Sequence, residues 1–203
     1  IDYGSGNIQA IATIYKNLNI KYQVITKPED LEKADKLILP GVGAFDATMQ
    51  QLIDSGLKDK LNELVLEKKV PVLGICVGLQ VMGYGSDEGN LPGLGWIPGQ
   101  VKKFDETKIE LKPKLPHMGW NNLEIKRPGV ILEGVKDDSW VYFVHSYRAQ
   151  PKFDDVITAE SDYGVKIPAV VEKNNFFGTQ FHPEKSGDVG KIMIQNFLSV
   201  CKK

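Results

Sequence analysis

Cysteine and histidine are scarce in this sequence, and their scarcity limits the chemistry open to it. Two cysteines, Cys76 and Cys201, cannot build a disulfide framework, so we expect a protein of the reducing cytoplasm. The three histidines do not cluster with cysteines at the spacing of a metal site. We therefore predict no metal centre, and Cys201 is interpreted as incidental.

Charge imbalance and long apolar runs are also missing. The 203 residues carry a formal net charge of −1, which gives no reason to expect nucleic acid or an anionic membrane as a partner. No apolar run reaches the length of a transmembrane helix, and no signal peptide opens the chain. Without repeats or linkers, residues 1–203 are predicted to form a single domain.

The pattern that is present alternates strands and helices in the first part of the chain. Helical spacing covers 8–18, 45–54 and 57–68, and short apolar runs at 22–25, 36–39 and 71–75 predict strands. This order is typical of a parallel sheet covered by helices. A strand normally precedes the turn at 2–7, and only Ile1 remains of it, so we expect the numbering to start late or the N-terminus to be trimmed.

After about Gly83 the pattern changes to one typical of antiparallel strands. Alternating stretches occur at 101–104, 120–125 and 140–144. Residues 169–172 and 176–181 predict a hairpin around 173–175, and 189–200 predict a closing amphipathic helix.

The most informative stretch is V-P-V-L-G-I-C-V-G-L-Q, residues 70–80. It reads as a buried strand that stops at Cys76, with Gly74 and Gly78 two positions to either side. Small residues there are what a tight strand-to-helix elbow needs, since bulky neighbours would collide. A cysteine at such a helix N-terminus is favoured as a thiolate. The plainer alternative is a small buried hydrophobe in a glycine-bounded turn.

A second stretch, F-H-P-E, follows a predicted strand at 181–184. Pro183 favours an extended conformation at His182, and Glu184 can then lie on the same side as the imidazole. A carboxylate so placed fixes the tautomer of a histidine whose other nitrogen faces a thiol. The alternative is a capping glutamate beside a surface histidine.

Together, G-I-C-V-G-L-Q and F-H-P-E resemble the class I (triad) glutamine amidotransferases, and P-G-V-G at 40–43 resembles the glycine segment beside their nucleophile. Within that class, I-D-Y-G-S-G-N at 1–7, P-H-M-G-W-N at 116–121 and Y-F-V-H-S-Y at 142–147 resemble the glutaminase subunits of imidazole glycerol phosphate synthase. The resemblance implies an α/β, flavodoxin-like fold. Its central sheet would be mostly parallel and flanked by helices, with an added antiparallel region.

The resemblance also implies the residues of a Cys-His-Glu triad. Cys76 would attack glutamine, His182 would relay protons and Glu184 would orient the imidazolium. Backbone N–H groups would meet the oxyanion, one from Val77 and one from the segment Gly41, Val42 and Gly43. Glycine permits a peptide flip there, although a plain turn is equally compatible with the sequence.

Substrate and partner residues are implied in the same way. Five positions match those that hold glutamine in the family: Gln80, Glu88, His145, Ser146 and Tyr147. Five more match the surface toward a (β/α)₈ barrel subunit: His117, Met118, Trp120, Asn121 and Lys185. The alternatives are a solvent-facing Gln80, a loop role for Glu88, a core Trp120 and a solvated Lys185.

The implied function is a glutaminase subunit in a heterodimer of histidine biosynthesis. It would release ammonia from L-glutamine and pass it to the barrel subunit, with no cofactor, since glutamine hydrolysis needs only thiolate, base and oxyanion donors. Two alternatives stay open. One is a paralogue that supplies a sugar-amidating enzyme of surface polysaccharide synthesis, and the other is a non-catalytic docking subunit.

Overall fold

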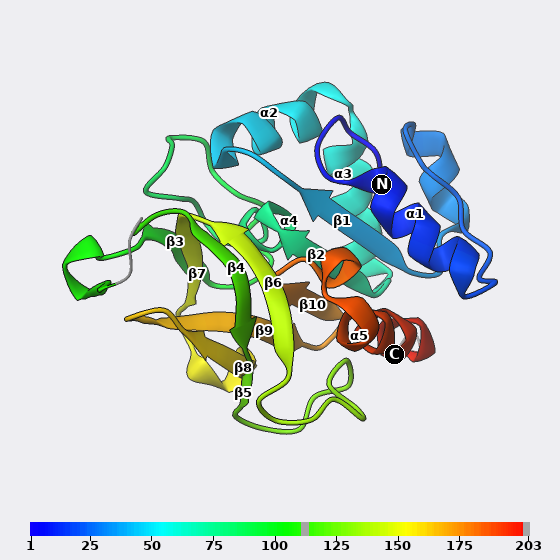
Figure 1. Ribbon diagram of the computed structural model, residues 1–203. Coiled ribbons are helices and arrows are strands. Elements are labelled where there is room, and N and C mark those ends of the chain that lie inside the picture. The colour runs from blue at the N-terminus through cyan, green and yellow to red at the C-terminus, as the bar shows by residue number, and fades with distance from the viewer. Residues whose placement is uncertain (111–113, 201–203) are drawn as a thin grey trace.

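The structure, a computed structural model, describes residues 1–110 and 114–200, so Cys201 lies outside the described residues. Its centre is a six-stranded mixed sheet in the order β1-β2-β10-β9-β8-β5 (Figure 1). The sheet strands are β1 (Leu37–Gly41), β2 (Val72–Cys76), β5 (Glu124–Ile125), β8 (Ile157–Asp162), β9 (Lys166–Lys173) and β10 (Phe176–Thr179). The helices are α1 (Ile8–Asn17), α2 (Phe45–Asp54), α3 (Leu57–Asn62), α4 (Val77–Gln80) and α5 (Gly187–Ser199).

The parallel part of the sheet is β1, β2 and β10, with β2 in the middle. Every residue of β2 is buried, so both faces of this strand are covered. Figure 1 shows α1 and α5 on the viewer's side of these strands and α3 on the far side. The prediction of a parallel sheet covered by helices is confirmed, and the carboxyl end of β2 is the point where Cys76 emerges.

The antiparallel part continues the same sheet through β10, β9, β8 and β5. The predicted hairpin at 169–181 is confirmed as β9 and β10. Two ribbons lie beside the sheet: β3 (Gly99–Lys103) pairs with β7 (Tyr147–Pro151), and β4 (His117–Asn122) pairs with β6 (Trp140–His145). Strands β7 and β8 were not predicted, because their mixed polar sequences lack a clear alternation.

The helical stretch predicted at 57–68 is confirmed: α3 ends at Asn62 and the chain continues as a π-helix (Glu63–Glu67). The strand predicted at 22–25 is wrong, since these residues form no strand. They face β1 across the first residues of the chain, where Ile1 N donates to Ile38 O at 3.0 Å and Asp2 N donates to Ile25 O at 2.8 Å.

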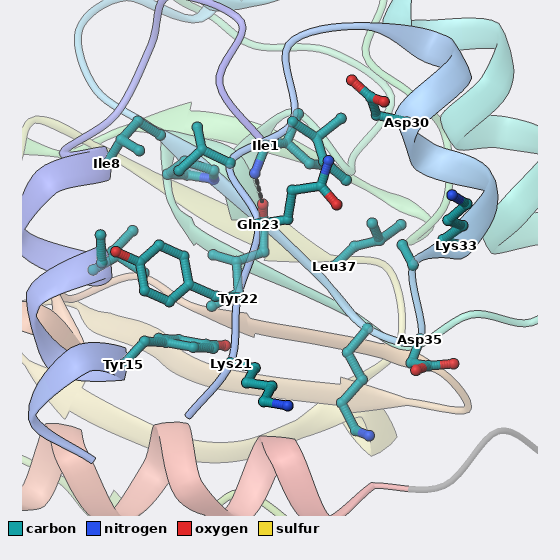
Figure 2. Close-up of a pocket in the computed structure, with 18 of the residues that line it drawn as sticks. Ile1, Ile8, Tyr15, Lys21, Tyr22, Gln23, Asp30, Lys33, Asp35 and Leu37 are labelled. Carbon is teal, nitrogen blue, oxygen red and sulfur yellow. Dashed lines mark hydrogen bonds between the residues drawn. The ribbon is translucent and has the colours of Figure 1, made fainter. Parts of the chain in front are cut away.

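The rest of the space between β1 and residues 22–25 is a cavity of about 420 Å³. Ile8 and Tyr15 of α1 line one side and Leu37 of β1 lines another (Figure 2).

One large hydrophobic cluster extends from α1 to α5 and includes both halves of the sheet. Among the described residues, no helix combines the length and apolar character needed to cross a bilayer.

Candidate active site

Cys76 sits at a strained elbow between β2 and α4. Its backbone has φ +54° and ψ −111°, a conformation that costs a non-glycine residue free energy and that clusters at functional sites. The cysteine is buried, and α4 begins at the next residue. The predicted strand-to-helix elbow is thus confirmed in its geometry.

Glycines make the elbow sterically possible. A Cβ on Gly78 would collide with the Leu39 carbonyl group, and one on Gly74 would lie 2.7 Å from the Gly78 oxygen. A Cβ on Gly41 would lie 2.5 Å from the nitrogen of Gly78. The backbones of β1, β2 and α4 therefore approach more closely than any side chain allows.

We expect Gly78→Ala to destabilise the fold by several kcal/mol, because the added methyl group meets rigid backbone rather than a movable side chain. Thermal unfolding measured by circular dichroism checks this. The matched control is Gly85→Ala, where the nearest atom to an added Cβ is the Gln100 side-chain oxygen at 3.4 Å. Equal melting temperatures for the two variants would contradict the packing argument.

His182 and Glu184 form a buried pair. The imidazole Nδ1 lies 2.7 Å from Glu184 Oε1, and both side chains are almost fully removed from solvent. The histidine backbone is fixed as well, since its N–H donates to Tyr142 O at 2.9 Å and its carbonyl accepts from Ser186 Oγ at 2.7 Å. Within the described part of the chain, His182 Nε2 has no hydrogen-bond partner.

The electrostatics of this pair favour the imidazolium form. Burial lowers the pKa of His182, but the side chains of Cys76 and Glu184 more than offset that effect and raise the pKa to about 9. The histidine therefore carries a proton on both nitrogens at neutral pH. The proton on Nδ1 is bound by Glu184, and Cys76 is the second side chain that stabilises the charged ring.

The sulfur of Cys76 has two further polar neighbours. Sγ lies 3.9 Å from Val144 O, and Gln180 Nε2 donates toward Sγ at 3.8 Å. Sequence reasoning missed Gln180. The signal available in the sequence was a side-chain amide two residues before His182, within the predicted strand at 176–181. In the structure this amide is fully buried and hydrogen-bonded.

The glycine segment at the end of β1 is hydrogen-bonded to Ser5. The Val42 N–H donates to Ser5 Oγ at 3.0 Å, and the Val42 carbonyl accepts from the same hydroxyl at 3.1 Å. Gly43 follows with φ +91°, in the region that glycine favours. Among the predicted oxyanion donors, Val77 starts α4, whereas the N–H of Val42 is already bonded.

Three predicted substrate residues lie in one hydrogen-bond cluster. Gln80 is buried rather than solvent-facing, and its Nε2 donates to Tyr147 O at 2.9 Å and to Gln180 Oε1 at 3.2 Å. His145 is buried, and its Nδ1 lies 2.7 Å from the same Tyr147 oxygen. Ser146, between them in sequence, is half-buried.

Glu88 lies in a different local setting. Its Oε2 accepts from Phe45 N at 2.8 Å, so one carboxylate oxygen holds the first residue of α2. In the opposite direction, the carboxylate of Asp46 in α2 accepts from the backbone N–H groups of Asn90 and Leu91 at 2.8 and 3.0 Å. The loop that carries Glu88 is thereby fixed to the start of α2.

The predicted partner surface divides between exposed and buried residues. On β4, Met118 and Trp120 are 61% and 51% exposed, and Lys185 Nζ lies 5.7 Å from the ring centroid of Tyr142. The prediction for His117 needs correction, because successive side chains of a strand point to opposite faces and this one points inward. Asn121 is half-buried on the same inward side.

Two further observations concern regions away from the elbow. In residues 1–110 and 114–200, no group of three histidine, cysteine, aspartate or glutamate side chains is placed to hold a metal ion. The cavity of Figure 2 is lined by none of the residues around Cys76, so it is separate from the elbow.

A cysteine elbow beside a buried His-Glu pair on a mixed α/β sheet defines a class of protein, and comparison with known proteins agrees. The family model "Glutamine amidotransferase class-I" matches residues 1–201. A solved structure described as a glutamine amidotransferase superposes with a TM-score of 0.74 at 19% identity, covering 96% of this chain and 93% of that one. This likeness supports the fold.

Relatives that match over nearly their full length identify the family within this class. The chain is 40% identical to an imidazole glycerol phosphate synthase subunit HisH of Leptospira borgpetersenii and 46% identical to a HisH 2 subunit of Pseudomonas aeruginosa. Each match covers 98% of both chains. The chain therefore belongs to the class I glutamine amidotransferases and, within them, to the HisH family. Both levels of the resemblance seen in the sequence are confirmed.

Proposed function

We propose that this chain is the glutaminase subunit of an imidazole glycerol phosphate synthase, and that Cys76, His182 and Glu184 are its catalytic triad. The observation that carries the proposal is the strained Cys76 elbow facing a histidine whose Nδ1 is fixed by a buried carboxylate at 2.7 Å. The names of the full-length relatives support the choice of pathway. We also propose that residues 1–203 act as one domain in the cytoplasm.

In this mechanism the Cys76 thiolate attacks the side-chain amide carbon of L-glutamine. The tetrahedral adduct collapses as His182 Nε2–H protonates the departing nitrogen, so that a C–S bond replaces the C–N bond and ammonia leaves. The histidine, now neutral, takes a proton from water, and the resulting attack releases glutamate and regenerates the thiolate. Glu184 keeps Nδ1 protonated throughout.

Backbone N–H groups stabilise the oxyanion in both steps. Val77 supplies one from the start of α4, and the segment Gly41–Gly43 supplies the other after its peptide turns toward the elbow. The N–H of Val42 is engaged by Ser5, so the isolated chain rests with an incomplete oxyanion hole. One such donor contributes about 3 kcal/mol of transition-state stabilisation.

A prediction follows for Ser5. We expect Ser5→Ala to raise the glutaminase rate of the chain without its partner several-fold, because the hydroxyl no longer holds the Val42 peptide in its resting orientation. Release of glutamate is the measurement. Thr48→Val is the control, since Thr48 Oγ1 lies 3.4 Å from both the Val42 carbonyl oxygen and Ser5 Oγ, and its loss leaves the Val42 N–H bonded to Ser5. A slower Ser5→Ala enzyme would contradict this role.

Substrate contacts are assigned to the predicted residues. Gln80 and the backbone of His145, Ser146 and Tyr147 would bind one end of L-glutamine, and Glu88 would bind its α-ammonium group. One oxygen of Glu88 is fixed by Phe45 N–H, which aims the carboxylate. No cofactor is required for this hydrolysis.

The exposed side of β4 is the proposed docking surface for the (β/α)₈ barrel subunit. It presents Met118 and Trp120 with Lys185 nearby, and large aromatic anchors of this kind dominate many interfaces. Ammonia would pass to the barrel, which would make imidazole glycerol phosphate and an aminoimidazole carboxamide ribonucleotide. Histidine biosynthesis is the pathway that this assignment implies.

The experiment that tests the function measures glutamate released from L-glutamine by the purified chain. It is repeated with the cognate barrel subunit and that subunit's ribonucleotide ligand. We expect a low rate for the chain alone and a large increase with the liganded barrel. Glutaminase activity that never responds to the barrel would overturn the synthase assignment, and absence of activity in both assays would overturn the enzyme assignment.

A further inference from the structure

The side chains of two buried histidines, His117 and His145, have no part in the proposed mechanism. The ring of His117 packs against Phe143 and Tyr163, with centroids 4.6 and 4.0 Å away, and its Nδ1 lies 3.1 Å from His145 Nε2. Burial lowers the pKa of His117 to about 4. Burial, with His117 nearby, lowers that of His145 to about 3. Both rings are therefore neutral, and each has one donor and one acceptor nitrogen.

The surroundings allow only one arrangement of their protons. The Tyr147 carbonyl can only accept, so His145 Nδ1 is the donor of the 2.7 Å bond and its Nε2 is an acceptor. His117 must then donate from Nδ1 and accept at Nε2. The group that faces His117 Nε2, at 3.3 Å, is the side-chain amide nitrogen of Asn121, which is a donor.

The same Tyr147 carbonyl begins a second arm that leads to the nucleophile. It accepts from Gln80 Nε2, whose other hydrogen is directed to Gln180 Oε1. The amide nitrogen of Gln180 then donates toward Cys76 Sγ at 3.8 Å. The side chains of Gln80, Gln180 and Cys76 are buried, so bulk water does not compete for their hydrogen bonds.

We propose that these groups form one hydrogen-bonded relay, whose two arms meet at the Tyr147 carbonyl, and that it positions the donor facing Cys76 and couples it to strand β4. In order, the relay is Asn121, His117, His145, the Tyr147 carbonyl, Gln80 and Gln180. The inference rests on the proposed role of Cys76 as nucleophile. It assigns His117 and His145 as positioning residues and gives Gln180 a donor role toward the thiolate.

Strand alternation explains why the relay can respond to a partner. Met118 and Trp120 point outward from β4, and His117 and Asn121, next to them in sequence, point inward. A surface that presses on the two exposed side chains shifts the backbone that carries the two relay members. A double-mutant cycle measures the coupling between the two ends of the relay.

The first measurement is the nitrogen-15 spectrum of the histidine side chains in the intact chain at pH 7. We expect His117 and His145 both neutral with the proton on Nδ1, which is the less common tautomer of free histidine. A proton on Nε2, or a charged ring, at either position would overturn the relay. This readout needs no glutaminase activity, so it judges the relay even if the proposed function fails.

The second measurement uses Asn121→Asp, which exchanges a donor for an acceptor at the far end. His117 must turn its proton toward the carboxylate, which leaves His145 without a proton for the Tyr147 carbonyl. We expect kcat for glutamine hydrolysis at saturating barrel subunit to fall about tenfold, with KM changing less than twofold. Asn121→Leu removes the donor without demanding reversal, so both histidines keep Nδ1–H and the loss of kcat is smaller.

A double-mutant cycle separates the relay from simple damage. Gln180→Met removes the donor to Cys76 while filling similar space. In that background, Asn121→Asp should cost little further kcat, because the last link is already absent. Full additivity of the two losses, or reversed tautomers with unchanged kcat, would overturn the proposal. Melting temperatures of all variants show whether each one is folded.

Discussion

Cys76→Ala is expected to abolish glutamine hydrolysis, with kcat lowered by about 10⁴-fold or more both with and without the barrel subunit. The physical reason is that no other group at the elbow can form the thioester. Removal of a triad nucleophile elsewhere costs losses of this order or greater. The fold should persist, since alanine is smaller than cysteine and keeps the same backbone conformation, with its φ of +54°. Glutamate release and thermal unfolding together check both expectations.

Cys201→Ala is the matched control for Cys76→Ala. It removes the other cysteine of the chain and should leave kcat unchanged, because the resemblance gives this position no role. Ammonia supplied directly should still support the synthase reaction of the barrel with the Cys76→Ala chain bound. Retained glutaminase activity in Cys76→Ala would refute the nucleophile assignment, whereas loss of the ammonia-dependent reaction would indicate a broken interface.

The parts of the site that sequence could predict are those in which neighbouring residues determine the geometry. Gly74 and Gly78 flank Cys76 closely enough for the elbow to be inferred from sterics alone, and the structure reproduces it. Likewise, Glu184 lies two positions after His182, and their contact needs only an extended backbone. Both features could be predicted because residues close together in the sequence determine their geometry.

The parts that sequence could not predict depend on long-range packing. Ser5 reaches Val42 across 37 residues, and Gln180 reaches Cys76 across 104. The topology of the sheet brings each pair together. The spacing of the residues in the sequence therefore does not predict either contact. The burial of His117 was missed for a related reason: the side of β4 that faces inward is set by its pairing with β6.

The same distinction explains the error at 22–25. A run of alternating apolar residues predicts a strand by its own pattern, but a strand exists only when a neighbouring backbone completes the ladder. At 22–25 the backbone bond from Asp2 N to Ile25 O, at 2.8 Å, does not make such a ladder. The prediction of the hairpin around 173–175 is confirmed because its two strands, β9 and β10, pair within one short stretch of sequence.

Glu184→Gln is expected to lower kcat by about 10³-fold while keeping the shape of the pair. The amide cannot balance the charge of the imidazolium, and it can present a donor where Nδ1–H needs an acceptor, so the wrong tautomer is favoured. The wild-type contact at 2.7 Å is buried, which leaves no water to take over the role. Glu133→Gln, the same charge change at an exposed position, is the control for net charge.

The dependence of stability on pH gives a second readout of the same pair. Burial lowers the pKa of His182, and Cys76 and Glu184 together raise it from 6.5 to about 9. A pKa raised in the folded state stabilises the fold fully below pH 6.5, and this contribution is lost as pH rises through about 9. The net shift corresponds to on the order of 3 kcal/mol, which remains after burial has offset part of the contributions of Cys76 and Glu184.

Urea unfolding of wild-type and Glu184→Gln chains between pH 6 and pH 10 measures the contribution of Glu184 to the free energy of unfolding. We expect the difference in unfolding free energy to be largest near pH 6 and to shrink toward pH 10, since the wild-type imidazole is then neutral as well. A difference independent of pH would mean that Glu184 acts only through packing. In that case the loss of kcat in Glu184→Gln could not be attributed to the charge of the imidazolium.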